Sequence, residues 1–257
     1  MSADLIERCR SLASLPHIQC LARARDFGEG AVSVLRRSAS VEAAPRVLVT
    51  AGIHGDEPAG SWALADLLHR DALPREVEWT LLPCLNVTGL RNNCRENAEG
   101  IDLNRDFLHC RSREVAFYVE TIPKFGPYDL LLSLHEDWEF QESYVYEINT
   151  SCRCGCAAGI LRVLGDCTGL VTAPCIDDHF PIEPGLIVHE PEADEPDNWP
   201  ESIYMVKKFP LLAYTLETPS ALPLDLRVQC QQRVLAYVAS FLAQDSAKLD
   251  RSLPEGS

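Results

Sequence analysis

The chain has 257 residues, and at about 150 residues per domain this length allows one large domain or two small ones. It holds 23 Lys and Arg against 38 Asp and Glu, a formal net charge of −15. This acidity argues against binding to nucleic acid or anionic membranes, which requires clustered basic residues. Hydrophobic residues make up 46% and charged residues 24%, which is ordinary for a soluble globular protein.

The start of the chain and its apolar runs indicate a cytoplasmic protein. Asp4 and Glu7 lie where a secretory signal would need basic and then apolar residues. Runs such as 130–132 and 211–213 fall far short of the roughly 20 residues that cross a bilayer. We therefore expect no membrane segment and a cytoplasmic location.

The cysteine content is high. Eleven cysteines without a secretory signal predict reduced thiols rather than disulfides. Cys152, Cys154 and Cys156 alternate, a spacing that fits a zinc knuckle poorly, so their role stays open between free thiols and a second metal or redox site.

Strands and helices are expected to alternate along the chain. Hydrophobic patterning predicts strands at 46–51, 77–84, 129–134 and 205–216. It predicts helices at 58–68, 114–122 and 224–243. No repeat or linker divides the chain, so we expect a single catalytic domain over 1–245 and a frayed tail over 246–257.

This alternation predicts the fold class. Strands that look buried on both faces, with helices between them, indicate an α/β fold with a mixed, mainly parallel central sheet and helices on both faces. Ligands in such sheets bind at the carboxyl ends of the strands. The polar segment 52–57 and His135 each follow a predicted strand directly, so we expect the functional site there.

The segment after the first of these strands offers metal ligands. It has the sequence Gly-Ile-His-Gly-Asp-Glu, which places His54 and Glu57 three residues apart where glycines allow a tight turn. A hydrolytic zinc site takes three protein ligands, and two histidines with one glutamate are a standard set. The spacing alone is weak, because chance gives about 0.6 such matches in this composition and the chain has two.

The second match and the remaining histidines lack this context. His189 and Glu192 open a segment whose residues 190–201 hold three prolines and six acids, and we interpret this segment as a solvated loop. The other histidines are interpreted as surface or structural residues: His17, His69, His109 and His179.

The third metal ligand is expected at another strand end. Segment 129–134 is mostly apolar, as in a buried strand, and His135 follows it. A lone histidine is more often a hydrogen-bonded core residue, but the His54 and Glu57 pattern favours a ligand here. We predict that His54, Glu57 and His135 hold one zinc ion.

Four segments, in order, resemble the zinc metallocarboxypeptidases of the carboxypeptidase A type, and most closely their compact bacterial branch. They are Gly-Ile-His-Gly-Asp-Glu at 52–57, Arg-Glu-Asn-Ala-Glu-Gly-Ile-Asp-Leu-Asn-Arg-Asp-Phe at 95–107, Ser-Leu-His at 133–135 and Thr-Leu-Glu-Thr-Pro at 215–219. The resemblance covers roughly 45–220, and the chain is shorter than most catalytic domains of this type.

The resemblance implies a role for each matching residue. Zinc would be held by His54, Glu57 and His135; Arg95 would stabilise the oxyanion; Asn104 and Arg105 would hold the terminal carboxylate of the substrate; and Glu217 would be the general base and acid. The residue types suit these tasks, because a carboxylate can shuttle the proton of an attacking water and a guanidinium can bind a carboxylate through two hydrogen bonds.

Several assignments stay open. Arg91 is a rival to Arg95, and the tyrosine that such enzymes often carry near the site is assigned to Tyr204, with Tyr214 as the other candidate. The acidic stretch 136–139 could orient the ligands, select cationic substrate groups or form a solvated loop.

The leading hypothesis is a zinc-dependent carboxypeptidase-like hydrolase that cleaves an amide bond next to a free carboxylate. The expected substrate is a peptide, a cell-wall peptide or an amino-acid conjugate. The alternative is an N-acyl amino acid deacylase of the aspartoacylase and succinylglutamate desuccinylase type. A third hypothesis, an inactive binding module, conflicts with the presence of all three ligands and Glu217. Side-chain specificity and oligomeric state are not encoded in any motif of the sequence.

Overall fold

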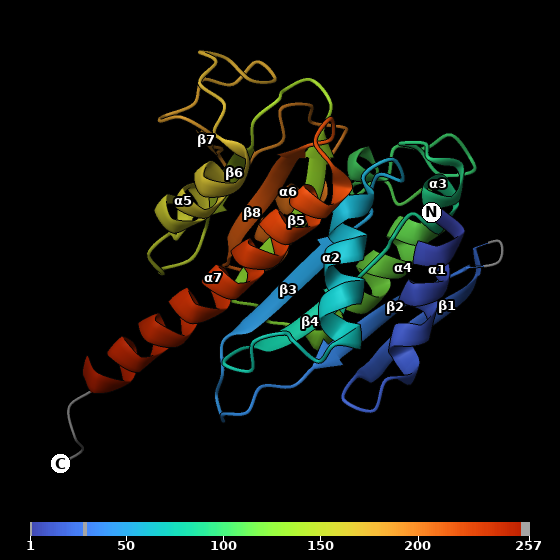
Figure 1. Cartoon of the computed structure of the whole chain (residues 1–257), viewed down its shortest axis with the longest axis horizontal. Coiled ribbons are helices and arrows are strands. Elements are labelled where there is room, and N and C mark those ends of the chain that lie inside the picture. The colour runs from blue at the N-terminus through green and yellow to red at the C-terminus, as the bar shows by residue number, and fades with distance from the viewer. Residues whose placement is uncertain (1, 28–29, 253–257) are drawn as a thin grey trace.

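The computed structural model of the chain describes residues 2–27 and 30–252. Within these residues eight strands form one sheet in the order β1-β2-β4-β3-β5-β8-β6-β7 (Figure 1). The strands are β1 Gln19–Phe27, β2 Gly30–Arg37, β3 Arg46–Ala51, β4 Glu78–Leu82, β5 Leu130–Asp137, β6 Tyr144–Asn149, β7 Leu186–Val188 and β8 Leu212–Pro219. The central strands β4, β3, β5 and β8 are parallel, and antiparallel pairs flank them on both sides.

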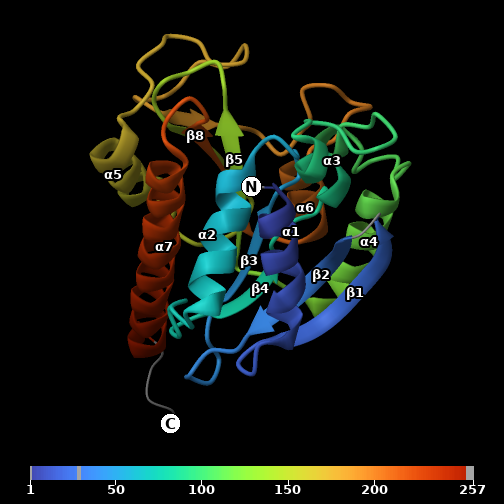
Figure 2. The same ribbon diagram turned by 45° about the vertical axis from the view of Figure 1, so that its right-hand side comes forward.

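Helices cover both faces of this sheet. The longer helices are α1 Ser2–Ser11, α2 Pro58–His69, α4 Arg113–Thr121, α5 Ala157–Thr168, α6 Glu201–Lys208 and α7 Leu224–Ser252, and shorter ones are α3 Val87–Asn92, η1 Leu12–Ser14, η2 Leu103–Arg105 and η3 Ile122–Phe125. Figure 2 shows α1, α2 and α7 in front of the sheet and α4 and α6 behind it. The predicted mixed, mainly parallel α/β fold is confirmed.

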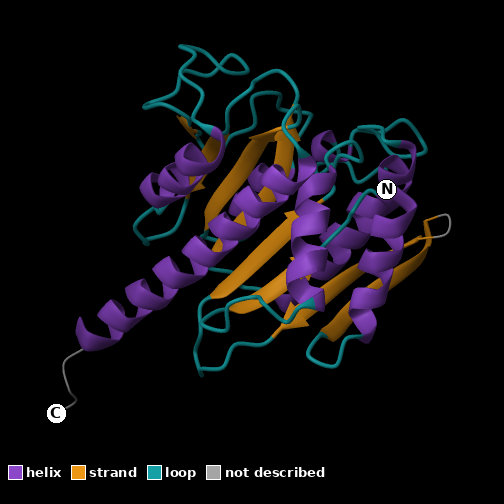
Figure 3. Ribbon diagram, viewed as in Figure 1, coloured by secondary structure: helices purple, strands orange, loops and turns teal. Residues whose placement is uncertain are grey.

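Burial on both faces explains why the central strands carry so few polar residues. Residues 130–132 of β5 and 47–49 of β3 are fully buried; α2 packs against both strands, and α6 packs against β5. Such strands have continuous apolar sequences instead of alternating ones. The polar residues appear where the strands end, and Figure 3 shows the loops gathered beyond the arrowheads of the central strands.

The turn between β3 and α2 depends on two glycines. Gly52 has φ +61°, a left-handed conformation that side chains with a Cβ rarely adopt, and its carbonyl accepts a hydrogen bond from Asn86 N at 2.7 Å. At Gly55, a Cβ would lie 2.0 Å from the backbone of Gly89. Pro58 then begins α2 at a position where its missing N–H leaves no partner unsatisfied.

Two expectations about the second half of the chain were wrong. The predicted strand 205–216 is two elements, because Met205 belongs to α6 and β8 begins only at Leu212 after Pro210. The apolar residues of α6 have helical spacing, but the eight residues of this helix were too few to distinguish it from a strand by pattern alone. The predicted frayed tail 246–257 continues α7 as a helix to Ser252, and its remainder lies outside the described residues.

All eleven cysteines lie in the described part of the chain, and all are free thiols. Among the described helices, none combines the length and apolar character of a membrane span.

Candidate active site

Three predicted ligands converge at the carboxyl ends of the central strands. His54 and Glu57 come from the turn after β3, and His135 comes from the end of β5, the neighbouring strand. His54 Nδ1 lies 2.6 Å from Glu57 Oε1, His135 Nδ1 lies 2.9 Å from Glu57 Oε2, and the two Nδ1 atoms are 3.3 Å apart. Donor atoms of these three side chains all lie within 4.8 Å of one another, which is a metal-binding arrangement.

The other nitrogen of each imidazole has its own partner. His54 Nε2 lies 3.3 Å from Asp102 Oδ1, and His135 Nε2 lies 3.2 Å from Ser133 Oγ. Ser133 Oγ in turn donates to the buried Glu201 carboxylate at 2.6 Å. Such partners take the Nε2–H and leave the Nδ1 lone pairs facing each other and Glu57, as in histidines that bind metals.

The charges at this point favour a bound cation. Burial lowers the pKa of His54, but the Glu57 and Asp102 carboxylates outweigh this effect and raise it to about 9. Burial raises the pKa of Glu57, but His54 and His135 outweigh it and hold that pKa well below its usual range. Two imidazoles and a buried carboxylate therefore attract positive charge between them, and this donor set fits zinc or a similar divalent ion.

Glu217 lies beside the cluster on the next strand. It pairs with His135 in the register of β5 and β8 and lines the same cavity. Burial raises the pKa of Glu217 well above its usual range, and the Glu57, Asp137 and Asp177 carboxylates raise it further. Since a raised pKa favours the protonated form, this carboxyl group has the properties of a proton carrier.

Arg95 is held between the cluster and Asp102. Its Nε donates to Asp102 Oδ2 at 2.9 Å, and its Nη1 lies 3.8 Å from Glu57 Oε1. The side chain is 40% exposed and lines the cavity. Arg91, the rival, lies on the exposed last turn of α3 and is absent from the described residues that line the cavity.

Asn104 and Arg105 lie on η2 and also line the cavity. Asn104 is 9% exposed, and its Oδ1 accepts from the backbone N of Glu201, which ties η2 to the start of α6. Arg105 is exposed, and its Nη1 donates to the carbonyl of Asn104 at 2.9 Å. The hydrogen bond to the neighbouring carbonyl orients the Arg105 guanidinium, which stays accessible to a molecule bound in the cavity.

The structure does not bring Tyr204 to the cavity. Its ring packs against Phe107 and Tyr118, with centroids 5.8 and 6.4 Å apart, because this face of α6 covers the aromatic residues around α4. The tyrosines that line the cavity are Tyr144 and Tyr146 of β6. The assignment of Tyr204 to substrate binding therefore has no support in the geometry.

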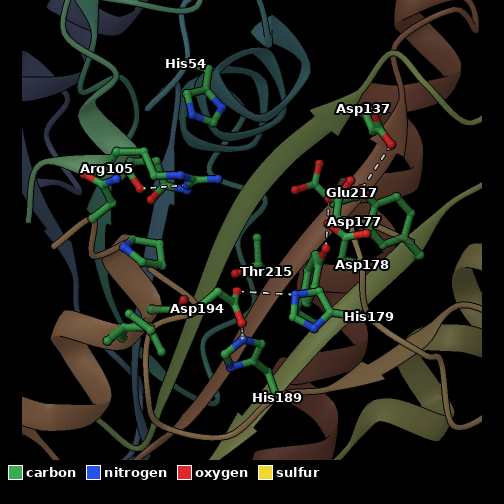
Figure 4. A pocket seen from close by; sticks show the side chains of 18 of the residues that line it. His54, Arg105, Asp137, Asp177, Asp178, His179, His189, Asp194, Thr215 and Glu217 are labelled. Carbon is green, nitrogen blue, oxygen red and sulfur yellow. Dashed lines mark hydrogen bonds and ion pairs between the residues drawn. The ribbon is translucent and has the colours of Figure 1, made fainter. Parts of the chain in front are cut away.

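A cavity of about 730 Å³ joins these residues (Figure 4). Arg105 lies on one side, while Asp137, Asp177 and Asp178 lie on the opposite side. Asp137 accepts a hydrogen bond from Tyr144 Oη at 3.0 Å. The cavity is therefore basic on one wall and acidic on the other.

Glu136, which follows His135, is buried rather than part of a solvated loop. Its carboxylate accepts from Ala59 N at 2.8 Å and pairs with Arg227 of α7, and burial raises its pKa to about 7 despite these partners. Its backbone N donates to Glu57 Oε2 at 3.2 Å. Glu136 thus holds the start of α2 through its carboxylate and orients Glu57, a predicted metal ligand, through its backbone N.

The interpretation of His189 as part of a solvated loop and of His179 as a surface or structural residue was incomplete. Both line the cavity and face Asp194, whereas Glu192 is exposed and takes no part. Segment 190–201 is acidic and rich in proline, as the sequence indicated, but it folds back as a wall of the cavity. No sequence pattern marks this contact, because His179 and His189 meet through tertiary structure.

Sequence comparison connects the chain to two groups of enzymes. Residues 43–120 match the model of the succinylglutamate desuccinylase/aspartoacylase catalytic domain. The chain is also 29% identical over 116 residues to carboxypeptidase SOL1 of Arabidopsis thaliana, which covers 40% of this chain. The chain spans less than a quarter of that relative, 23% of its length.

Solved structures resemble the whole fold. A Shewanella denitrificans protein described as a metallopeptidase superposes with a TM-score of 0.71 at 25% identity, and the match covers 94% of this chain and 87% of that protein's chain. One from Shewanella amazonensis gives 0.75 at 23% identity, covering 94% and 92%. A Pseudomonas aeruginosa metallo-carboxypeptidase, solved in complex with (2-guanidinoethylmercapto)succinic acid, gives 0.62 at 21% identity, covering 93% and 68%. The chain is therefore similar in fold to solved metallo-carboxypeptidases, and its segment 43–120 is similar to the desuccinylase and aspartoacylase catalytic domain.

Proposed function

We propose that this protein is a zinc-dependent hydrolase that cleaves an amide bond next to a free carboxylate. The observation that carries the proposal is the convergence of His54, Glu57 and His135 in one cavity with Glu217 on the adjacent strand. An inactive binding module would have no need for this combination. The residue roles below are part of the proposal.

A zinc ion held by these three ligands would lower the pKa of a bound water toward 7 and polarise the scissile carbonyl. Glu217 would take the proton of the attacking water and deliver it to the leaving amine. A carboxyl group whose pKa is raised by burial suits this double task, because it accepts a proton more readily than an exposed one.

Two arginines would bind the charges of the substrate. Arg95, fixed by Asp102 close to Glu57, would stabilise the negative charge that develops on the carbonyl oxygen. Asn104 and Arg105 would hold the terminal carboxylate, since a guanidinium offers two parallel donors to it. The position of Arg105 supports this assignment, because this exposed side chain lies on the cavity wall opposite the acidic residues.

The acidic wall favours a substrate whose second polar group is neutral or cationic. Asp137, Asp177 and Asp178 face the cavity, so an additional carboxylate at that end would meet like charges in a partly desolvated space. We therefore propose that peptides or amino-acid conjugates with a neutral or basic group next to the cleaved bond are preferred to acidic ones.

The alternative is an N-acyl amino acid deacylase. One observation favours it: the matched segment 43–120, which contains His54, Glu57, Arg95 and Arg105, is described by the desuccinylase and aspartoacylase model. Both activities use the same hydrolytic centre and release an amino acid that carries a free carboxylate; they differ in the acyl side of the amide, which is a peptide in one and a simple acyl group in the other.

The zinc-loaded enzyme should be assayed on three matched substrate sets. These are dipeptides with a free C-terminus, the same dipeptides amidated at the C-terminus, and N-acyl amino acids. The proposal predicts turnover of the first set, loss of most turnover on amidation, and a preference for basic over acidic side chains. Turnover of N-acyl amino acids alone would establish the alternative.

The chemistry is tested by E217Q. We expect kcat to fall roughly 10²- to 10⁴-fold while zinc content stays at the wild-type level. E120Q is the matched control, because Glu120 is exposed on α4, pairs with Lys124 and does not belong to the described lining of the cavity, so this variant should retain full activity. If E217Q hydrolyses substrates as fast as wild type, the proposed role of Glu217 is wrong.

A further inference from the structure

A second group of metal-binding side chains lies in the wall of the same cavity. His179 is in the loop between α5 and β7, His189 follows β7 directly, and Asp194 is five residues farther on. In Figure 4 the three side chains point toward one another. His179 Nε2 lies 3.3 Å from Asp194 Oδ2, and His189 Nε2 lies 3.0 Å from Asp194 Oδ1.

Hydrogen bonding fixes which atom of His189 faces the carboxylate. Its Nδ1–H donates to the carbonyl of Glu190 at 2.5 Å, so Nε2 carries the lone pair in the neutral imidazole. That lone pair points at an oxygen of Asp194, and two acceptors that face each other at 3.0 Å repel unless a positive charge lies between them. A backbone carbonyl on the outer nitrogen is also the usual arrangement for a metal-binding histidine.

The two imidazoles are held in place before any ligand binds. The backbone N of His189 donates to the carbonyl of Glu147 on β6 at 2.9 Å, and the backbone of His179 exchanges two hydrogen bonds with Ile176, at 2.8 and 2.9 Å. The rings of His179 and Tyr146 meet edge to face, with centroids 5.7 Å apart. The His189 side chain is 12% exposed and that of His179 is 24% exposed.

We propose that His179, His189 and Asp194 form a second divalent-metal site, separate from the His54, Glu57 and His135 cluster. The donor atoms of the three side chains lie within 4.8 Å of one another, and none belongs to the first cluster. Two imidazoles and one carboxylate select zinc and related transition metals over magnesium or calcium, which prefer oxygen ligands.

The position of the site indicates its role. Each ligand comes from a loop that walls the cavity, and the loops around 176–179 and 189–194 share no strand pairing with each other among the described residues. A shared ion would join them, as a structural zinc ion joins loops in other folds. Glu217 lies in register beside His135 of the first cluster, so we assign the hydrolysis to the first ion and the shaping of the cavity wall to the second.

The test is the number of zinc ions bound by metal-free protein that has been equilibrated by dialysis at buffered free Zn²⁺. Wild type should bind two equivalents, H179Q/H189Q one, and H54Q/E57Q one. H109Q is the matched control, since His109 is exposed and lies outside both clusters, and it should bind two. Far-UV circular dichroism confirms that each variant is folded.

Failure of this proposal is distinguishable from failure of the proposed function. If H54Q/E57Q is folded and binds no zinc, the second site does not exist, whatever the wild type hydrolyses. If H179Q/H189Q binds as much zinc as wild type, Asp194 and the two histidines form only a proton-shared ion pair and the proposal is wrong.

A second measurement follows the loops themselves. Zn²⁺ should slow amide hydrogen exchange of segments 176–179 and 189–194 in wild type and in H54Q/E57Q. It should have no such effect in D194N, which removes one negative charge from an exposed side chain and leaves both imidazoles. Equal protection in D194N and wild type would contradict a bridging ion at this position.

Discussion

The two histidine clusters of the cavity each combine two imidazoles with one carboxylate but have different settings. His54, Glu57 and His135 are 3, 7 and 2% exposed and lie at strand ends and at a helix start. In the second cluster the Asp194 side chain is 65% exposed, and all ligands lie in loops. A set of metal-binding side chains therefore does not by itself define a catalytic centre. Burial and hydrogen-bond partners determine how firmly the side chains are positioned and how reactive the site is.

The partners of the imidazoles show this difference. In the first cluster the outer nitrogens meet Asp102 and the Ser133–Glu201 pair, so carboxylates support both ligands. In the second, His189 is supported by a backbone carbonyl alone. Among the described residues only the first cluster has an arginine in contact, and Glu217, its proposed proton carrier, lies in register on the neighbouring strand. We therefore assign chemistry to the first cluster and organisation of the cavity wall to the second.

The largest expected difference comes from the same substitution in each cluster. H135Q should reduce kcat/KM by roughly 10²-fold or more, because it removes a ligand of the catalytic metal. H189Q should leave kcat within about threefold and act mainly on KM, since it alters the wall of the cavity. Steady-state kinetics of the two purified variants measure this, and equal losses of kcat would erase the distinction between the clusters.

A smaller effect is expected at the support of His54. D102N should weaken zinc binding about 10- to 100-fold, because the amide no longer holds the Nε2–H with a full negative charge. D56N removes the same charge from an exposed residue next to Glu57 and is the matched control. Competition with a fluorescent chelator gives both affinities. Equal losses in the two variants would mean that net charge, not the hydrogen bond to His54, matters.

At the substrate end, R105K should raise KM about tenfold and change kcat little. The lysine ammonium group makes only one of the two parallel contacts of a guanidinium with the carboxylate, and a tenfold loss corresponds to ~1.4 kcal/mol. R70K is the control, since Arg70 is exposed and its guanidinium pairs with Asp66, away from the cavity. The effect should disappear on substrates amidated at the C-terminus. A loss that persists on amidated substrates would contradict a role in carboxylate binding.

The smallest effect concerns Glu201, the buried carboxyl group behind His135. Burial raises its pKa, although hydroxyl groups of Ser133, Tyr118 and Thr50 donate to it. A raised folded-state pKa means that its contribution to stability is present at low pH and is lost as pH rises through that value. In metal-free protein, E201Q should therefore destabilise the fold more at about pH 5 than at about pH 8. Urea unfolding at both pH values measures this, and the opposite trend would show that the pKa is lowered.

How much of the site was predictable depended on whether a residue lies near the end of a strand or in a matching segment. His54, Glu57, His135 and Glu217 each follow or end a strand, and hydrophobic patterning locates strand ends well. The parallel order that brings these ends together follows from the alternation of strands and helices. The matching segments supplied Arg95, Asn104 and Arg105, which line the cavity as expected.

The supporting residues could not be predicted in the same way. Glu201 lies 68 residues from its partner Ser133, and its contact depends on α6, which was predicted as a strand. Arg227 meets Glu136 only because α7 returns across the sheet. His179 and His189 occupy loops whose conformation is set by tertiary contacts with β6 rather than by local sequence. Such pairs carry no periodicity, so a single sequence contains no signal for them.

The most direct test of this account is a crystal structure of the zinc-loaded protein with anomalous diffraction recorded on both sides of the zinc edge. The account predicts a strong peak bonded to Nδ1 of His54, Nδ1 of His135 and the Glu57 carboxylate, with Glu217 nearby but not bound to it. A second peak is expected between His179, His189 and Asp194. A zinc-loaded crystal with no peak at the first cluster would contradict the assignment of that cluster as the catalytic metal centre.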